Sequence, residues 1–180
     1  MAKKKISPPG YINVTSTLMT SAIKIYSTWK KLDAQIDAIS TRGINFPGEL
    51  SEIFACYVLK YQWKKDGHGD AFDPVNKRII EVKGSGSHKK DLSSFSPSES
   101  FAELIFVKVD KDEDKAYIYE TGVSSDDLKL IQVNTTENVG NQQAANRRPL
   151  FSIESKIIAK KGLTPSYELD IMAKTITKLK

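Results

Sequence analysis

Apolar residues in the first third of the chain recur at the spacing of an α-helix. Between residues 15 and about 40 they return every three or four positions, a pattern that predicts one helix or two. A second helical pattern follows residues 45–48, where a proline and acidic residues stand near the start, as helix N-termini prefer. Its apolar stripe runs from Leu50 to Tyr61. The first third of the chain is therefore predicted to be helical.

Beyond residue 68 the apolar period changes to two, which indicates β-strands. The predicted strands span residues 69–73, 78–84, 103–110 and 115–120. Turn-forming residues at 73–77 join the first pair, and residues 111–114 join the second. The third strand is nearly continuously apolar, so we expect it near the centre of the sheet. A short helix is expected from Ser124 or Ser125, followed by a polar stretch at 133–149 that is rich in Asn and Gln.

These elements predict an α/β (α+β) domain in which a mixed central β-sheet is flanked by helices. A chain of 180 residues suits one well-packed domain, so we expect residues 1–180 to fold as one unit. Residues 1–12 carry a lysine cluster and a Pro-Pro-Gly break, and they are predicted to form a flexible basic arm.

The composition excludes several classes of protein. With 39% hydrophobic and 27% charged residues the chain is typical of a globular protein, and no apolar run approaches the roughly 20 residues of a membrane span. The N-terminus lacks the apolar region of a secretory signal, so we expect a cytoplasmic protein. Cys56 is the only cysteine, which excludes an internal disulfide framework and a cysteine zinc cluster. A formal net charge of +5 suits a polyanionic partner such as nucleic acid without requiring one.

The most informative segment is a predicted hairpin that carries Asp70 on one arm and Glu81 and Lys83 on the other. Because successive side chains on a strand alternate faces, Glu81 and Lys83 project together. Ile80 and Val82 project the other way. Two carboxylates beside a lysine can bind a hard divalent cation and stabilise charge that develops on a phosphate. An x-Glu-x-Lys tetrad alone is more often an exposed strand face with ordinary salt bridges. Three neighbouring features favour a functional site: the apolar pair Ile79-Ile80 before the tetrad, the Gly-Ser-Gly-Ser loop that follows Lys83, and the aspartate on the preceding hairpin arm.

With these residues in this arrangement, the sequence resembles the PD-(D/E)xK nuclease superfamily, and within it a small type II restriction endonuclease. The resemblance implies a restriction-endonuclease-like core, with Asp70 and Glu81 as ligands of Mg²⁺ and Lys83 as the catalytic lysine. Gly69 stands where the family pattern has a proline, a substitution that is frequent in the superfamily. Asp73 is an alternative to Asp70 as the first ligand, although its place in the turn favours a role in turn formation.

The superfamily often adds a glutamate on the helix before the hairpin. Glu52 stands at that position in the sequence Gly-Glu-Leu-Ser-Glu that begins the second predicted helix, so the resemblance implies a catalytic role for Glu52. Glu49, one turn earlier, is the alternative, although an acidic residue there also complements the helix dipole. His68 and His88 flank the proposed site, and such histidines are more often loop residues or phosphate contacts than bases or ligands.

Candidate DNA contacts lie in two polar segments. The segment after the Lys83 strand combines small polar and basic residues that suit phosphates, and residues 141–148 carry amide and arginine side chains that suit base edges. The predicted contacts are Ser85, Ser87, Lys89, Lys90, Gln142, Gln143, Asn146, Arg147 and Arg148. An ordinary solvent loop would explain residues 141–148 equally well.

The resemblance implies a Mg²⁺-dependent endonuclease that cuts both strands of double-stranded DNA within a short recognition sequence. It also implies a homodimer whose two-fold axis matches that of the site. The alternatives are a Holliday-junction resolvase or mismatch nicking enzyme of the same fold, a non-catalytic DNA-binding module that uses only basic charge, and a helical interaction domain built on residues 15–40. The last of these does not explain why Asp70, Glu81 and Lys83 occur together.

Overall fold

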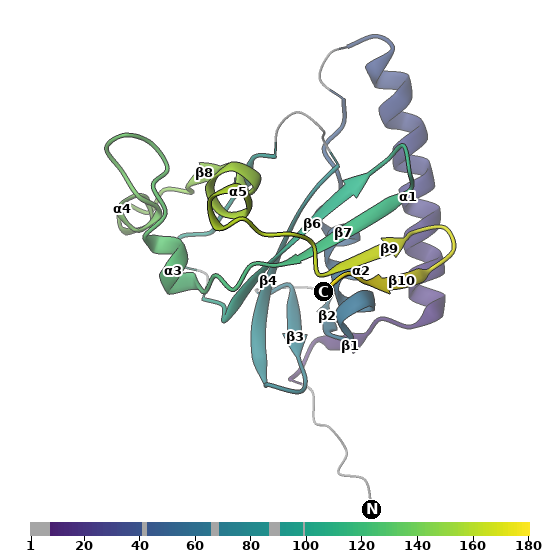
Figure 1. Ribbon diagram of the computed structural model, residues 1–180, viewed down its shortest axis with the longest axis horizontal. Helices are drawn as coiled ribbons and strands as arrows, with labels where there is room; N and C mark the ends of the chain where they lie inside the picture. Colours follow the sequence, from purple (N-terminus) through teal and green to yellow (C-terminus); the bar gives the residue numbers. More distant parts are fainter. Residues whose placement is uncertain (1–7, 41–42, 66–68, 87–90, 99) are drawn as a thin grey trace, which may run out of the picture.

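The chain folds around an eight-stranded mixed β-sheet in the computed structural model (Figure 1). The structure describes residues 8–40, 43–65, 69–86, 91–98 and 100–180. The neighbouring strands across the sheet are, in order, β1 (Tyr11–Asn13), β2 (Gln62–Lys64), β3 (Ala71–Asp73), β4 (Arg78–Ser85), β6 (Glu103–Asp110), β7 (Lys115–Glu120), β9 (Tyr167–Asp170) and β10 (Thr175–Lys178). β4 and β6 run parallel, and the other neighbours in this sheet are antiparallel. The mixed central sheet expected from the sequence is therefore confirmed, with β6 in its interior.

Helical elements pack on both faces of this sheet. α1 (Ser16–Asp37) and α2 (Gly48–Leu59) share a core with Val82 and Ile105 on one face. On the opposite face, Leu104 and Phe106 join a second core formed with smaller elements. These elements are α3 (Ser125–Lys129), α4 (Val139–Ala144), the π-helical turn η1 (Glu154–Ile158) and the ribbon of β5 (Ser93–Ser94) and β8 (Leu150–Phe151). The short helix α5 (Ala159–Lys161) follows η1 and has no buried residue. In Figure 1, α3, α4, α5 and β8 lie to the left of the sheet and α1 lies to its right. None of the helices in the described part of the chain is long and apolar enough to cross a membrane.

Polar contacts tie α1 to the turn between β6 and β7. The Tyr26 hydroxyl donates a hydrogen bond to Asp114 at 2.7 Å. Asp33 is buried, and its carboxylate accepts hydrogen bonds from the Lys111 ammonium at 2.5 Å and from the Ile44 N–H at 2.7 Å. Since an unpaired buried charge is costly, these bonds allow Asp33 to fix the end of α1 against both the sheet and the loop that leads to α2.

α2 approaches the sheet very closely at Gly84. A Cβ atom at Gly84 would lie 1.7 Å from Ser51 Oγ and 2.5 Å from Ser51 Cβ. Only a residue without a side chain permits this contact. The close approach brings the start of α2, including Glu52, next to the part of β4 that carries Lys83.

Most of the predicted elements are present. The first helical pattern is the single helix α1, and the strands predicted at 103–110 and 115–120 coincide with β6 and β7. The strand predicted at 78–84 is β4, which is one residue longer, and the strand predicted at 69–73 is shortened to β3. Ser124 is the N-cap of α3, as the acidic residues after it suggest.

The prediction of a flexible arm over residues 1–12 is wrong at its C-terminal end. Within the proposed arm 1–12, Tyr11 and Ile12 belong to β1, where Tyr11 lies opposite Lys64 of β2. The Tyr11 side chain is buried, so this segment is part of the sheet. Residues 1–7 lie outside the described residues.

Gly84→Ala should destabilise the fold by about 1–3 kcal/mol, the range for overpacking a core site, because the new methyl group overlaps Ser51. Urea unfolding followed by circular dichroism measures the change. Gly48→Ala is the control, since the nearest atom to a Cβ there is Glu52 Oε1 at 3.8 Å. Ser51→Gly in the Gly84→Ala background should restore part of the loss. Equal stability of Gly84→Ala and wild type would contradict the close contact.

Candidate active site

The candidate active site lies where β3 separates from β4. The two strands pair over three residues, and the pair of Ala71 and Ile80 is the last before they part. Beyond this point β4 continues along β6 on its other side. Asp70, directly before β3, turns its side chain toward β4, where Oδ2 accepts a hydrogen bond from the Val82 N–H at 2.8 Å. The Asp70 carboxylate is therefore held against the middle of the Glu-Val-Lys run.

Glu81 and Lys83 lie on the face of β4 that is turned away from α1 and α2. Ile80 and Val82 belong to the core under those helices, which confirms the alternation expected from the sequence. Glu81 is only 1% exposed, and its Oε1 forms an ion pair with Lys83 Nζ. The Lys83 ammonium also lies 5.5 Å from the centre of the Phe95 ring. The structure thus brings the predicted lysine and both predicted carboxylates to one stretch of β4.

Glu52 reaches the same neighbourhood from α2. Its side chain is half-buried, and its Oε2 accepts a hydrogen bond from Trp63 Nε1 at 2.7 Å. Burial, and next the negative charge of Asp70, raise the pKa of Glu52 to about 7 against the lowering effects of the Trp63 bond and the Lys83 charge. Glu49 is exposed in the first turn of α2. The geometry therefore favours Glu52 over Glu49 as the glutamate contributed by the helix.

Gly69 explains why a proline is missing before Asp70. Its φ of +83° lies in the left-handed region, whereas the proline ring fixes φ at about −65°. A Cβ atom at Gly69 would lie 2.9 Å from both Ile79 Cγ2 and the Tyr11 hydroxyl. In this fold the chain can turn Asp70 onto β4 only through a residue without a side chain.

Asp73 forms the turn, as its position in the sequence suggested. Its buried carboxylate accepts hydrogen bonds from the Val75 N–H at 2.9 Å, from Asn76 Nδ2 at 2.7 Å and from Arg78 at 3.1 Å. Although burial raises the pKa of Asp73, these bonds together lower it. Both oxygens of Asp73 are thus used within the turn, which favours Asp70 as the carboxylate that faces the site.

The oxygen atoms of Asp70 and Glu81 fit Mg²⁺, which prefers hard oxygen ligands. Within the described residues, no group of three or more His, Cys, Asp or Glu side chains is placed to hold a metal ion by itself. In Mg²⁺ sites of enzymes that act on phosphates, one or two carboxylates bind the ion, and water and substrate oxygens complete its shell. Asp70 before β3 and Glu81 on β4 supply two such carboxylates.

Trp63 and Phe95 contact the candidate residues, and the sequence pattern did not single them out. Trp63 stands in β2, whose three residues are too few to show an alternation. Phe95 is an isolated aromatic residue in a serine-rich segment, yet it is almost fully buried and stacks on Phe151 with ring centres 5.2 Å apart. An aromatic residue in such a polar context is a signal that could have marked it as an anchor.

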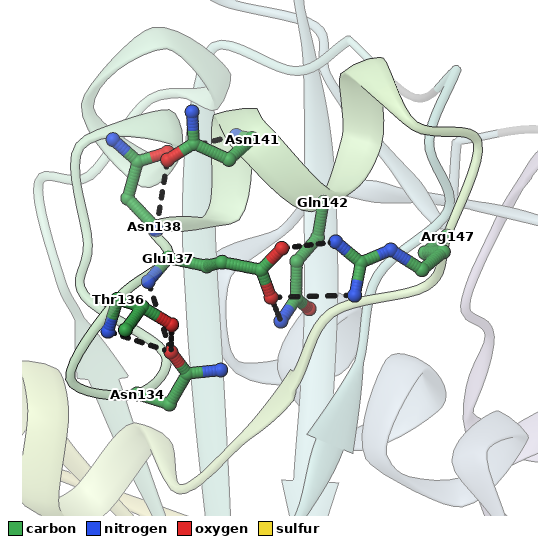
Figure 2. A network of polar contacts seen from close by, with 7 residues as sticks. All are labelled: Asn134, Thr136, Glu137, Asn138, Asn141, Gln142 and Arg147. Carbon is green, nitrogen blue, oxygen red and sulfur yellow. Dashed lines mark hydrogen bonds and ion pairs between the residues drawn. The ribbon is translucent and has the colours of Figure 1, made fainter.

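The predicted base-reading segment is held by its own polar contacts, shown in Figure 2. Glu137 accepts hydrogen bonds from Gln142 Nε2 at 3.1 Å and from Arg147 Nη1 at 3.2 Å, and it pairs with the second terminal nitrogen of Arg147. The bonds from Arg147, and next from Gln142, lower the pKa of Glu137 to about 2. Gln143 donates to the Ser96 carbonyl at 3.0 Å, which attaches α4 to the segment that carries Phe95.

The other predicted DNA contacts fall into three groups. Asn146 and Arg148 are exposed, so their side chains are accessible to DNA. Ser85 is buried in β4 and Gln142 is buried in the Glu137 network, so these two side chains are not placed to contact DNA. The remaining predictions lie outside the described residues: Ser87, Lys89 and Lys90, together with the histidines His68 and His88.

Comparison with known proteins identifies the family. The family model described as Bsp6I restriction endonuclease matches residues 14–160, which include every candidate site residue. The Type II restriction enzyme Bsp6I of Bacillus sp. (strain RFL6) is 40% identical over 169 residues, which cover 94% of this chain and 97% of that enzyme. No solved structure matches the chain significantly. The family match and the nearly full-length relative together show that the chain belongs to the Bsp6I restriction endonuclease family.

Proposed function

We propose that this restriction endonuclease hydrolyses the phosphodiester bonds of double-stranded DNA with Mg²⁺ at the site formed by Asp70, Glu81 and Lys83. Family membership gives the reaction class, which is site-specific cleavage of DNA by a type II restriction enzyme. The observation that carries the assignment to these residues is the hydrogen bond between Asp70 and the Val82 N–H, because it holds one carboxylate beside the other and beside the lysine. The identity to a type II restriction enzyme favours this function over a junction resolvase, a mismatch nicking enzyme or a non-catalytic binding module.

Each side chain has a role that follows from its position. Asp70 and Glu81 would hold Mg²⁺, and such a cation supplies activation of water and neutralisation of phosphate charge. Lys83 is fixed by Glu81, so its ammonium can orient the attacking water or stabilise the negative charge that develops on the phosphate. Glu52 adds a carboxylate near Asp70, and its burial, followed by the negative charge of Asp70, raises its pKa to about 7.

We further infer a homodimer. The described residues of one chain form one such site, and a dimer would bring two of them, related by a two-fold axis, to the two strands of a duplex in a single binding event. A dimer of this kind would bind a recognition sequence whose symmetry matches its own. We also infer that the enzyme acts in the cytoplasm, where its DNA substrate lies.

The purified enzyme should cut a sequenced plasmid into discrete, reproducible fragments when Mg²⁺ is present, and it should not cut when the ion is removed with EDTA. The expected dependence follows from the proposed role of the two carboxylates, which is to bind the cation that activates water and neutralises phosphate charge. Agarose gel electrophoresis gives the readout, and re-addition of Mg²⁺ is the control for irreversible loss of activity. Undiminished cleavage in EDTA would exclude the proposed metal dependence, and a smear of fragments would exclude site specificity.

Glu52→Gln should lower the single-turnover cleavage rate by about 10–100-fold, the usual effect of changing a group that supports a metal site. Glutamine keeps the acceptor for Trp63 and removes only the charge, so the stability of the fold should change little. Glu49→Gln is the matched control on the same helix and should cleave like wild type. The opposite ranking of the two variants would assign the role to Glu49.

A further inference from the structure

A cavity of about 360 Å³ opens directly beside the candidate active site. Its lining includes Tyr11, Lys64, Gly69, Ile79 and Ser100. These residues come from β1, β2, β4 and the segments before β3 and β6, so the cavity is assembled by the same strands that position Asp70. None of these residues has a role in the chemistry proposed above.

The cavity lies on the same face of the sheet as the catalytic groups. Ile79 is two residues before Glu81 on β4 and therefore shares its face. The separation along a strand is about 6.6 Å, close to the rise of two nucleotides in one strand of B-DNA. The backbone of Lys64 is joined to that of Asp70, since the Lys64 N–H donates to the Asp70 carbonyl at 3.0 Å. A DNA strand that runs along β4, with its cleaved phosphate at the carboxylates of Asp70 and Glu81, would therefore place a nucleotide within two steps of that phosphate at the cavity.

The chemistry of the lining suits a nucleotide. The Lys64 ammonium lies 5.3 Å from the centre of the Tyr11 ring, at a distance typical of a cation–π contact, and supplies positive charge for a phosphate. Ser100 adds a polar residue to the lining. Tyr11 and Ile79 give apolar surface that suits a deoxyribose or a base.

Tyr11 forms a rigid wall of this cavity. Its hydroxyl donates to the Gly69 carbonyl at 3.3 Å, and its ring packs on Phe72 with ring centres 5.6 Å apart. A wall held in this way is already formed before DNA arrives, which reduces the entropy cost of binding.

We propose that this cavity is a subsite for a nucleotide within two steps of the cleaved phosphate, with Lys64 on the phosphate of that flanking nucleotide. The inference rests on the proposed function, because it takes the position of the cleaved phosphate from Asp70 and Glu81. It assigns a DNA contact to the N-terminal strand β1 and its neighbour β2, outside the segments in which the sequence predicted such contacts.

The test compares Lys64→Ala with Lys60→Ala. Lys60 is a matched control because its ammonium also lies over a tyrosine ring, 4.6 Å from the centre of Tyr57, but it does not line the cavity. Fluorescence anisotropy measures the binding of a duplex containing the recognition site in EDTA at several salt concentrations. Lys64→Ala should weaken binding and reduce the slope of log K against log salt by about 1, as expected when one phosphate contact is lost. Lys60→Ala should bind like wild type. Equal binding by all three proteins, or equal losses in both variants, would overturn the subsite.

A second measurement locates the contact on the DNA. Single phosphates around the mapped cut are replaced, one at a time, by uncharged methylphosphonates. At one flanking position the methylphosphonate should weaken DNA binding by wild type and by Lys60→Ala. At that position it should not weaken binding by Lys64→Ala any further, because this variant already lacks the contact. Additive losses at every position would contradict the assignment of Lys64 to a flanking phosphate.

Mg²⁺-dependent cleavage by the wild type distinguishes a failure of the subsite from a failure of the proposed function. If the wild type cuts at discrete sites and Lys64→Ala binds DNA like wild type, the subsite alone is wrong. If the wild type does not cut in Mg²⁺, the proposed function itself fails. Urea unfolding of both lysine variants checks that any loss of binding does not come from loss of the fold.

Discussion

The candidate site depends on one hydrogen bond, from the Val82 N–H to the carboxylate of Asp70. Where β3 leaves β4, the edge of β4 loses its antiparallel partner, and an unpaired backbone N–H in a buried position costs about 1–3 kcal/mol. Asp70 supplies the missing acceptor. The same contact therefore completes the hydrogen bonding of β4 and fixes a negative charge beside Glu81 and Lys83.

Two glycines make this geometry possible. Gly69 adopts a positive φ that turns Asp70 onto the strand edge, and Gly84 lets α2 approach β4 until Ser51 lies where a Cβ would be. The second contact brings Glu52 close enough to Asp70 for its pKa to rise to about 7 through burial and the charge of that neighbour. The carboxylates come together because the backbone elements that carry them are packed without intervening side chains.

The parts of the fold that the sequence predicted are those with a long periodic signal. α1, β4, β6 and β7 each carry enough residues for the period to be read, and the hairpin spacing was sufficient to pair Asp70 with Glu81. The strands β1, β2, β9 and β10 have three or four residues each, which is too short to show an alternation. They form because their backbones pair with neighbouring strands of the sheet, and such pairing depends on the tertiary structure.

The surroundings of the predicted DNA contacts also depend on tertiary structure and could not be predicted from residue type. Side-chain type correctly suggested a polar surface around residues 141–148, but it could not reveal that Glu137 binds Gln142 and Arg147. Such a contact depends on how the loop folds back on α4. In contrast, Lys64 gave no signal in the sequence, since its position beside Asp70 arises only when β2 and β3 pair.

The most direct test of the account is the single-turnover rate at which Asp70→Asn cleaves a duplex containing the recognition site in Mg²⁺. Asparagine keeps an oxygen acceptor for the Val82 N–H and removes the charge, so the unfolding midpoint should stay close to that of wild type. The Asp70→Asn rate should be at least about 100-fold lower than that of wild type, because metal-assisted hydrolysis loses several kcal/mol of transition-state stabilisation without the carboxylate. Wild-type cleavage by Asp70→Asn would contradict the assignment of the active site to the β3–β4 junction.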